Sequence, residues 1–210
     1  VQNINSTFSG GGVAEILSRM IPLLGQLGVE ARWDVIKGND EFFAVTKKFH
    51  NALHGREETI SSDEYALFLD INRRNLEEIK TFGDIIYIHD PQPVALVEKR
   101  AEIGGRWVWR CHIDVSNPRP DVWAFIRKFV VHYDAAAFSS PSFAQELPIR
   151  QFLISPSIDP LSDKNRELPQ QTIDSVMDKY NIPRDKPIIT QVSRFDRLKD
   201  PVGVIQAFEL

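Results

Sequence analysis

The 210-residue sequence lacks several features that mark specialised classes of protein. It has one cysteine, Cys111, so no disulfide can form within the chain, and we expect a reducing, cytoplasmic setting. Its apolar runs are far shorter than the roughly 20 residues that cross a bilayer, and no signal peptide is recognisable. These absences predict a globular protein with no membrane partner.

Basic residues and metal ligands are also scarce. The formal net charge is −4, which argues against a broad basic surface for nucleic acid. With five histidines, one cysteine and no Cys-x-x-Cys pair, the sequence predicts no dedicated metal site. We therefore expect no nucleic-acid partner, no metal and no cofactor.

What the sequence does have is an alternation of short apolar segments with amphipathic ones. An α/β domain with a Rossmann-like parallel sheet, covered by helices on both faces, is the fold that this alternation predicts. The expected strands are 1–5, 29–36, 84–90, 107–113, 135–140 and 150–155. The expected helices are 13–24, 40–53, 62–80 and 121–133.

After this domain the chain becomes polar and rich in proline and serine over 155–169, which is typical of a linker. A helix over 170–180, a strand over 186–195 and a helix from Pro201 onward are expected next. One strand and one helix cannot bury a core by themselves. We therefore expect an N-terminal domain over 1–168, and over 169–210 a linker helix with the truncated start of a second Rossmann-like domain.

Four polar clusters directly follow expected strands. They are Ser9-Gly10-Gly11-Gly12, His89-Asp90-Pro91, His112-Ile113-Asp114, and Ser193-Arg194 through Lys199. In open α/β sheets, ligands bind beyond the carboxyl ends of the strands. The clusters are therefore the candidate functional residues.

Each of the first three clusters has a structural alternative. The glycines could form a plain strand-to-helix turn or a cradle for a sugar or phosphate, but Glu15 breaks the G-x-G-x-x-G dinucleotide pattern. His89 could cap a helix that starts at a proline, and His112 could hydrogen-bond a neighbouring loop. Asp90 and Asp114 suit acid–base work only if they lie close together.

The fourth cluster carries two cations, Arg194 and Lys199, on the turn after an expected strand. Two cations near the start of a helix suit a diphosphate, because they add to the positive end of the helix dipole. A solvated surface turn is the alternative.

Taken together, these motifs resemble a known family. SRFDRLKDP (193–201) and SGGGVAEIL (9–17) resemble segments of retaining glycosyltransferases of family 4, which have the GT-B fold. IHDPQP, WVWRCHID and PSIDPLSDKN resemble the trehalose glycosyltransferring synthases more specifically. Those enzymes join a nucleotide-activated glucose to free glucose.

The resemblance implies an enzyme with two Rossmann-like halves, whose partners are a nucleoside-diphosphate glucose and glucose or trehalose. It implies catalytic roles for His112 on the donor sugar and for Arg194 and Lys199 on the leaving diphosphate. Gly11 and Gly12 would approach the donor. Gln92 joins His89, Asp90 and Asp114 as candidates for contacts with substrate.

The sequence ends before the two glutamates that the family places in its second domain, and it does not begin with methionine. We therefore expect a fragment that is inactive by itself. A trehalose phosphorylase of the same fold and a non-catalytic sugar-binding domain remain the alternatives. The donor base, and whether the protein forms a homodimer, stay open.

Overall fold

The computed structural model describes residues 1–80 and 83–209. The chain divides into two compact units, Val1–Ile158 and Asp159–Leu210. The boundary falls inside the polar segment 155–169 that the sequence marks as a linker. Each unit is described by itself.

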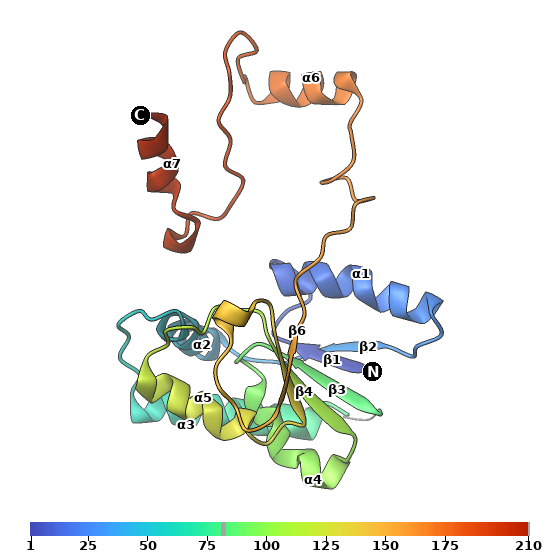
Figure 1. The fold of residues 1–210 in the computed structure, drawn as a ribbon, viewed down its shortest axis with the longest axis vertical. Helices are drawn as coiled ribbons and strands as arrows, with labels where there is room; N and C mark the ends of the chain where they lie inside the picture. Colours follow the sequence, from blue (N-terminus) through green and yellow to red (C-terminus); the bar gives the residue numbers. More distant parts are fainter. Residues whose placement is uncertain (81–82, 210) are drawn as a thin grey trace. The chain divides into compact units, whose positions relative to one another are not determined.

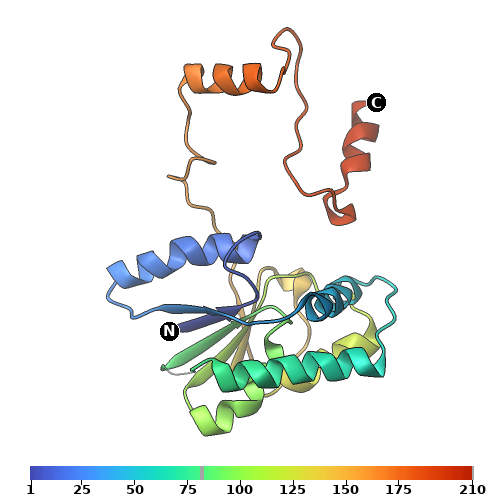
Figure 2. The same cartoon turned by 180° about the vertical axis from the view of Figure 1, so that it is seen from behind.

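The first unit is built on a parallel sheet (Figures 1 and 2). Its strands are β1 (Gln2–Asn5), β2 (Arg32–Val35), β3 (Ile85–His89), β4 (Arg106–Cys111), β5 (Ala135–Phe138) and β6 (Arg150–Leu153). Among the described residues the order across the sheet is β2-β1-β3-β4-β5-β6. The predicted Rossmann-like α/β fold is confirmed.

Helices cover both faces of this sheet, but unequally. One face carries α1 (Gly12–Gln26), and Figures 1 and 2 show α3 (Ser62–Glu78), α4 (Arg100–Ile103) and α5 (Pro120–Val130) on the other face. The 3₁₀ helix η1 (Val94–Lys99) packs against α3 and α5, and α2 (Asp40–Leu53) packs against the same two helices. A second 3₁₀ helix, η2 (Pro141–Phe143), follows β5.

The two faces of the sheet differ in chemistry because side chains alternate along each strand. Ile4 pairs with Ile88 and Ile88 with Trp109, so these buried side chains form one row toward the larger group of helices. On the opposite face, Asn3 lies level with Tyr87, and His89 lies level with Arg110. The central strands therefore carry buried polar groups on the face that α1 covers only in part.

The predicted helices α2 and α3 begin at side-chain caps that the sequence supplies. Asn39 accepts a hydrogen bond from the Phe42 backbone N–H at the start of α2. Ser61 and Glu64 form a capping box at the start of α3. η1 was not predicted, because residues 94–97 are all buried and therefore show no helical alternation of apolar and polar positions. α4 was not predicted, because its four residues are too few to show a helical period.

The second unit contains α6 (Gln170–Lys179), the 3₁₀ helix η3 (Arg197–Lys199) and α7 (Pro201–Phe208). The predicted strand over 186–195 is wrong for the described chain, where this segment has no regular structure. A strand needs a neighbouring strand to satisfy its backbone groups, and no other described segment of this unit supplies one. Val192 and Phe195 are consequently fully or almost fully exposed.

Candidate functional site

The connections of the sheet define a switch point between β1 and β3. From β1 the chain passes through α1 to β2 on one side, and from β3 it proceeds toward β4 on the other. Open α/β sheets bind ligands beyond the carboxyl ends of the strands at such a point. The glycine loop follows β1, and His89-Asp90-Pro91 ends β3, so both lie at the switch point.

Two histidines meet there. The Nδ1 atom of His89 lies 2.9 Å from the Nε2 atom of His112, which follows β4. The ring planes differ by 17°, and the centroids are 5.2 Å apart. This separation fits two rings hydrogen-bonded edge to edge in nearly one plane, not rings stacked face to face. The structure therefore joins two of the predicted site residues directly.

The second ring nitrogen of His89 is also engaged. Its Nε2 atom lies 3.0 Å from the Oδ1 atom of Asn3, in the middle of β1. His89 is only 2% exposed and Asn3 is completely buried. His89 therefore has no ring nitrogen left for a substrate, and it does not cap a helix.

Asp90 ties the ends of β3 and β4 together. Its backbone N–H donates to the Arg110 carbonyl over 2.8 Å, and its Oδ1 atom accepts from the His112 backbone N–H, also over 2.8 Å. The backbone of Asp90 has φ 65°, a left-handed conformation that is uncommon for a residue with a side chain. Such outliers cluster at functional sites, where the surrounding contacts hold them in place.

The surroundings of this cluster oppose charge on its side chains. Burial, followed by the nearby Arg110 cation, lowers the pKa of His112 to about 4. Burial, His112 and Arg110 together hold the pKa of His89 well below its usual value. Burial raises the pKa of Asp90 to about 7, against the opposing effects of the His112 N–H and Arg110. At neutral pH both histidines are therefore uncharged hydrogen-bonding groups.

Arg110 was missed as a site residue. It is 4% exposed, and its guanidinium donates to the carbonyls of Phe138 and Ile154 and to the hydroxyl of Ser139. The described residues place no carboxylate in ion-pair contact with it. In the sequence, Arg110 interrupts the apolar run 107–111. Charged side chains are rarely buried without a partner, so this interruption was the signal that could have identified Arg110 as a functional residue.

The glycine loop is open in the structure. Gly10, Gly11 and Gly12 are exposed, and a Cβ atom added to any of them would meet no atom within 4 Å. Gly10 needs its glycine because its φ is 74°. Gly12, the first residue of α1, has neither a positive φ nor a crowded surrounding, and no side chain caps the helix. Packing therefore gives no reason for glycine at Gly12.

Gln92 also lies beyond β3, and its Oε1 atom is buried without a hydrogen-bond partner. Asn72 of α3 donates from Nδ2 to the Gln92 carbonyl over 3.1 Å, and its own Oδ1 atom is likewise buried and unpartnered. One helical turn later, Asn75 exchanges two hydrogen bonds with the backbone of Lys37, just after β2. α3 thus holds the loops that follow β2 and β3. Sequence reasoning missed both asparagines, although polar residues on its apolar face were a signal.

Asp114 lies apart from these contacts. It is half-buried, and its Oδ1 atom accepts from the Ser116 backbone N–H over 2.8 Å. No contact joins it to Asp90 among the described residues. The predicted carboxylate pair therefore stays a prediction.

The two predicted cations belong to the second unit. Arg194 is exposed, and its Nη2 atom lies 3.5 Å from the Oδ2 atom of Asp196. Lys199 ends η3, and its backbone N–H donates to the Asp196 carbonyl over 2.9 Å. Both are solvated on the described turn, and a role toward a ligand stays a prediction.

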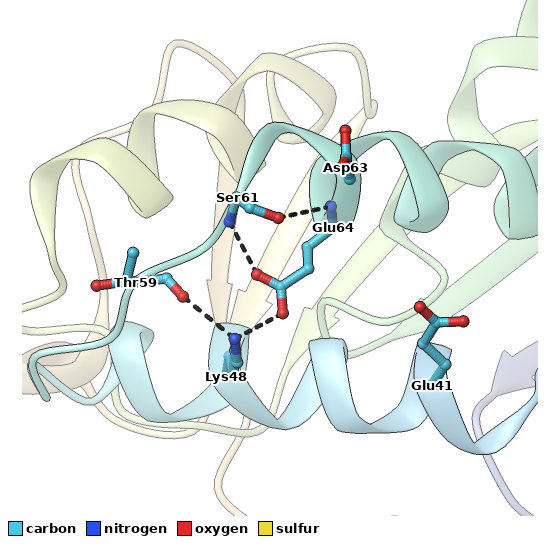
Figure 3. A pocket seen from close by; sticks show the side chains of 6 residues that line it. All are labelled: Glu41, Lys48, Thr59, Ser61, Asp63 and Glu64. Atoms are coloured by element: carbon cyan, nitrogen blue, oxygen red, sulfur yellow. Dashed lines mark hydrogen bonds and ion pairs between the residues drawn. The ribbon is translucent and has the colours of Figure 1, made fainter.

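The hollow shown in Figure 3 lies away from the switch point, between α2 and the start of α3. Lys48 donates to Glu64 over 2.6 Å and to the Thr59 carbonyl over 3.3 Å (Figure 3). Glu64 also accepts from the Ser61 backbone N–H. The hydrogen bonds of Lys48 and Ser61 lower the pKa of Glu64. These groups satisfy one another as a helix cap, so the hollow needs no ligand to explain it.

Two further features bear on metals and membranes. His50 lies in the last turn of α2 and His54 is the C-cap of that helix, a separation that two metal ligands can share, but His54 Nδ1 bonds the His50 carbonyl. Within 1–80 and 83–209 there is no group of three or more metal-ligating side chains. Over the same ranges, no helix has the length and apolar character to cross a membrane.

Comparison with known proteins supplies the family. The family model described as "Trehalose synthase, N-terminal domain" matches residues 3–145. The chain is 48% identical to a trehalose synthase of Pyrococcus horikoshii, over 98% of this chain and 50% of that protein. It is 38% identical to a trehalose synthase of Rubrobacter xylanophilus, over 100% of this chain and 52% of that protein. The chain thus spans about half the length of these relatives.

More distant matches are also to proteins whose names refer to trehalose. A trehalose phosphorylase of Pleurotus pulmonarius is 24% identical over 97% of this chain and 32% of its own length. Among solved structures, a trehalose-6-phosphate structure from E. coli, bound with UDP-2-fluoro glucose, superimposes with a TM-score of 0.59 at 13% identity. It covers 87% of this chain and 55% of that one. This likeness shows that the fold is that of GT-B proteins.

Proposed function

The chain belongs to the trehalose synthase family, and on that premise we propose that the protein transfers glucose from a nucleoside-diphosphate glucose to free glucose, forming trehalose with retention of configuration. The observation that carries this proposal is the His89-Asp90-His112 cluster, which is built from two strand ends at the switch point of the sheet. That is where an open α/β sheet binds small molecules.

The roles follow from the chemistry of each group. His112 contacts the donor sugar, since one of its ring nitrogens has no partner in the described protein. Gly11 and Gly12 let the backbone and the uncapped start of α1 approach the diphosphate and the transferred glucose. Asp90, Gln92 and Asp114 offer oxygen atoms and an amide to sugar hydroxyls. The unpartnered Oε1 atom of Gln92 supports its assignment.

Arg194 and Lys199 neutralise the leaving diphosphate. As the bond between the anomeric carbon and the phosphate oxygen breaks, negative charge grows on that oxygen, and fixed cations stabilise it without a metal. The acceptor hydroxyl attacks the same face of the anomeric carbon and forms the new bond, and its proton passes to the departing oxygen. This front-face course retains configuration and needs no protein nucleophile.

We further propose that residues 1–168 form the acceptor-side domain and that 169–210 begin the nucleotide-sugar domain. The chain by itself would then lack most donor contacts and turnover. The compact unit Val1–Ile158 supports the first part of this division. Because the chain spans about half the length of its relatives, we place the activity in a longer protein, and the single cysteine favours a cytoplasmic one.

The test uses the full-length protein that carries this sequence. It is incubated with free glucose and a panel of nucleoside-diphosphate glucoses, and the products are separated and identified. Trehalose formed with an equal amount of nucleoside diphosphate is the expected result. The panel identifies the preferred base.

A trehalose phosphorylase is the second candidate, favoured by the 24% identical relative. Its signature is glucose 1-phosphate formed from trehalose and inorganic phosphate, with no nucleoside diphosphate involved. If neither reaction occurs but calorimetry detects glucose or trehalose binding at micromolar concentration, the domain is a binding module and the transferase proposal is wrong.

A further inference from the structure

The orientation of the Asn3 amide sets the direction of the chain of hydrogen bonds that runs from Asn3 through His89 to His112. An amide oxygen only accepts hydrogen bonds. Oδ1 of Asn3 lies 3.0 Å from Nε2 of His89, so with the amide in this orientation that nitrogen carries the proton. A neutral imidazole has one proton, so the Nδ1 atom of His89 is an acceptor.

The same logic passes to the next ring. The acceptor Nδ1 of His89 lies 2.9 Å from Nε2 of His112, so this second nitrogen donates and carries the proton of His112. The Nδ1 atom of His112 is then left with a lone pair. The described residues offer it no hydrogen-bond donor, and His112 is only half-buried.

We propose that Asn3 and His89 are positioning residues that hold His112 in the tautomer protonated at Nε2, so that its Nδ1 atom accepts a hydrogen bond from a sugar hydroxyl. The sugar part of this inference rests on the proposed function. The tautomer part does not, because it concerns hydrogen bonds within the protein.

The sheet holds the first two residues of the hydrogen-bond relay Asn3–His89–His112 in place. Asn3 is in the middle of β1, and His89 ends the neighbouring strand β3, so the backbone of the sheet sets their distance. The near-coplanar arrangement of the two rings fixes the plane of the His112 ring as well as its proton. The hydrogen bond made by one ring nitrogen of a functional histidine decides which nitrogen carries the proton.

The direct test is ¹⁵N NMR of the histidine rings in the ligand-free, full-length protein at neutral pH. The two ring nitrogens of a neutral histidine give distinct shifts, so the protonated one is identified. Protonation at Nε2 in both His89 and His112 is expected. Protonation of His112 at Nδ1 would overturn the proposal, since it would mean that the relay runs in the opposite direction.

Two variants distinguish a positioning role of Asn3 from a general effect on protein stability. Asn3→Leu removes the acceptor and is expected to leave His112 as a mixture of tautomers. Asn5→Leu removes another buried asparagine from the same strand, one that bonds Trp33 and the Thr7 carbonyl, and should leave His112 unchanged. An unaltered His112 tautomer in folded Asn3→Leu would refute the positioning role. If that variant fails to fold, the wild-type spectrum still tests the proposal, because protonation of His112 at Nδ1 would overturn it.

The link to the sugar is tested with glucosyl donors in which each glucose hydroxyl in turn is replaced by fluorine, which cannot donate. At one position, kcat/KM of the wild type should fall about tenfold, the worth of one hydrogen bond, while the same replacement leaves His112→Ala unaffected. If no position behaves so although the tautomer is as expected, the relay stands and the assignment of His112 to the sugar fails.

Discussion

Replacing Asp90 by asparagine should remove a pH-dependent loss of stability from the first unit. Asparagine keeps an oxygen for the His112 backbone N–H and tolerates the left-handed backbone of this position, whose φ is 65°. The change therefore deletes the ionisation while leaving the local geometry in place.

The sign of the effect follows from the raised pKa. Burial raises the pKa of Asp90 from 3.8 to about 7, so the folded state holds the proton more tightly than the unfolded state. The stability that this proton confers is complete below pH 3.8 and is lost as the pH rises through about 7. In the variant this loss does not occur.

The magnitude has a limit set by the two pKa values. A rise from 3.8 to about 7 corresponds to at most about 4 kcal/mol of unfolding free energy. Asp90 is only half-buried, and solvent weakens the effect, so we expect about 2 kcal/mol. The variant should match the wild type near pH 4 and exceed it by this amount at pH 8.

Urea unfolding measured by tryptophan fluorescence suits this test, because Trp107 and Trp109 are completely buried in the same unit. The histidines titrate in both proteins, so their contribution cancels in the difference between them. Equal stability of the two proteins at pH 8, or a difference that is the same at pH 4 and pH 8, would refute the assignment of a raised pKa to Asp90.

Three further predictions concern other parts of the unit. Gly12→Val should abolish trehalose formation by the full-length protein without lowering its melting temperature, whereas Gly25→Val, in the same helix and equally uncrowded, should keep activity. Near-normal turnover in Gly12→Val would contradict the hypothesis that the glycine loop holds a sugar or phosphate. Glu64→Gln should lower the free energy of unfolding by about 1 kcal/mol at pH 7 and by much less near pH 3, because the lowered pKa of Glu64 gives stability that is lost as the pH falls. A loss that urea unfolding finds to be the same at both pH values would contradict this prediction. Arg110→Met should raise the pKa of His112 above about 4, as NMR titration would detect, since a nearby cation is removed; an unchanged value would show that burial alone sets it.

The sequence was sufficient to predict the first unit because its signals are local. Apolar runs and caps marked β3, α2 and α3 to within a few residues, and helix 40–53 matches α2 at both ends. Placing polar residues after strands was enough to bring His89, Asp90 and His112 together, since parallel strands end at one edge of a sheet.

What could not be predicted depends on partners distant in the sequence. The roles of Asn3 and Arg110 rest on contacts across 86 and 44 residues, which no spacing along the chain reveals. The segment 186–195 has the composition of a strand, yet composition cannot supply the neighbouring strand that its backbone requires.

The polar core of the site carries a cost that the fold must offset. Asn3 and Asn72 each keep one buried polar atom unpartnered, and such an atom typically costs about 1–3 kcal/mol. Arg110 adds a buried cation without a carboxylate partner in the described chain. Apolar side chains at these positions would pack without that cost, so stability alone does not explain the asparagines and the arginine. Under the proposed function, their contacts explain them, because Asn3 bonds the His89 ring, Asn72 bonds the loop after β3, and Arg110 bonds the backbone at the ends of β5 and β6.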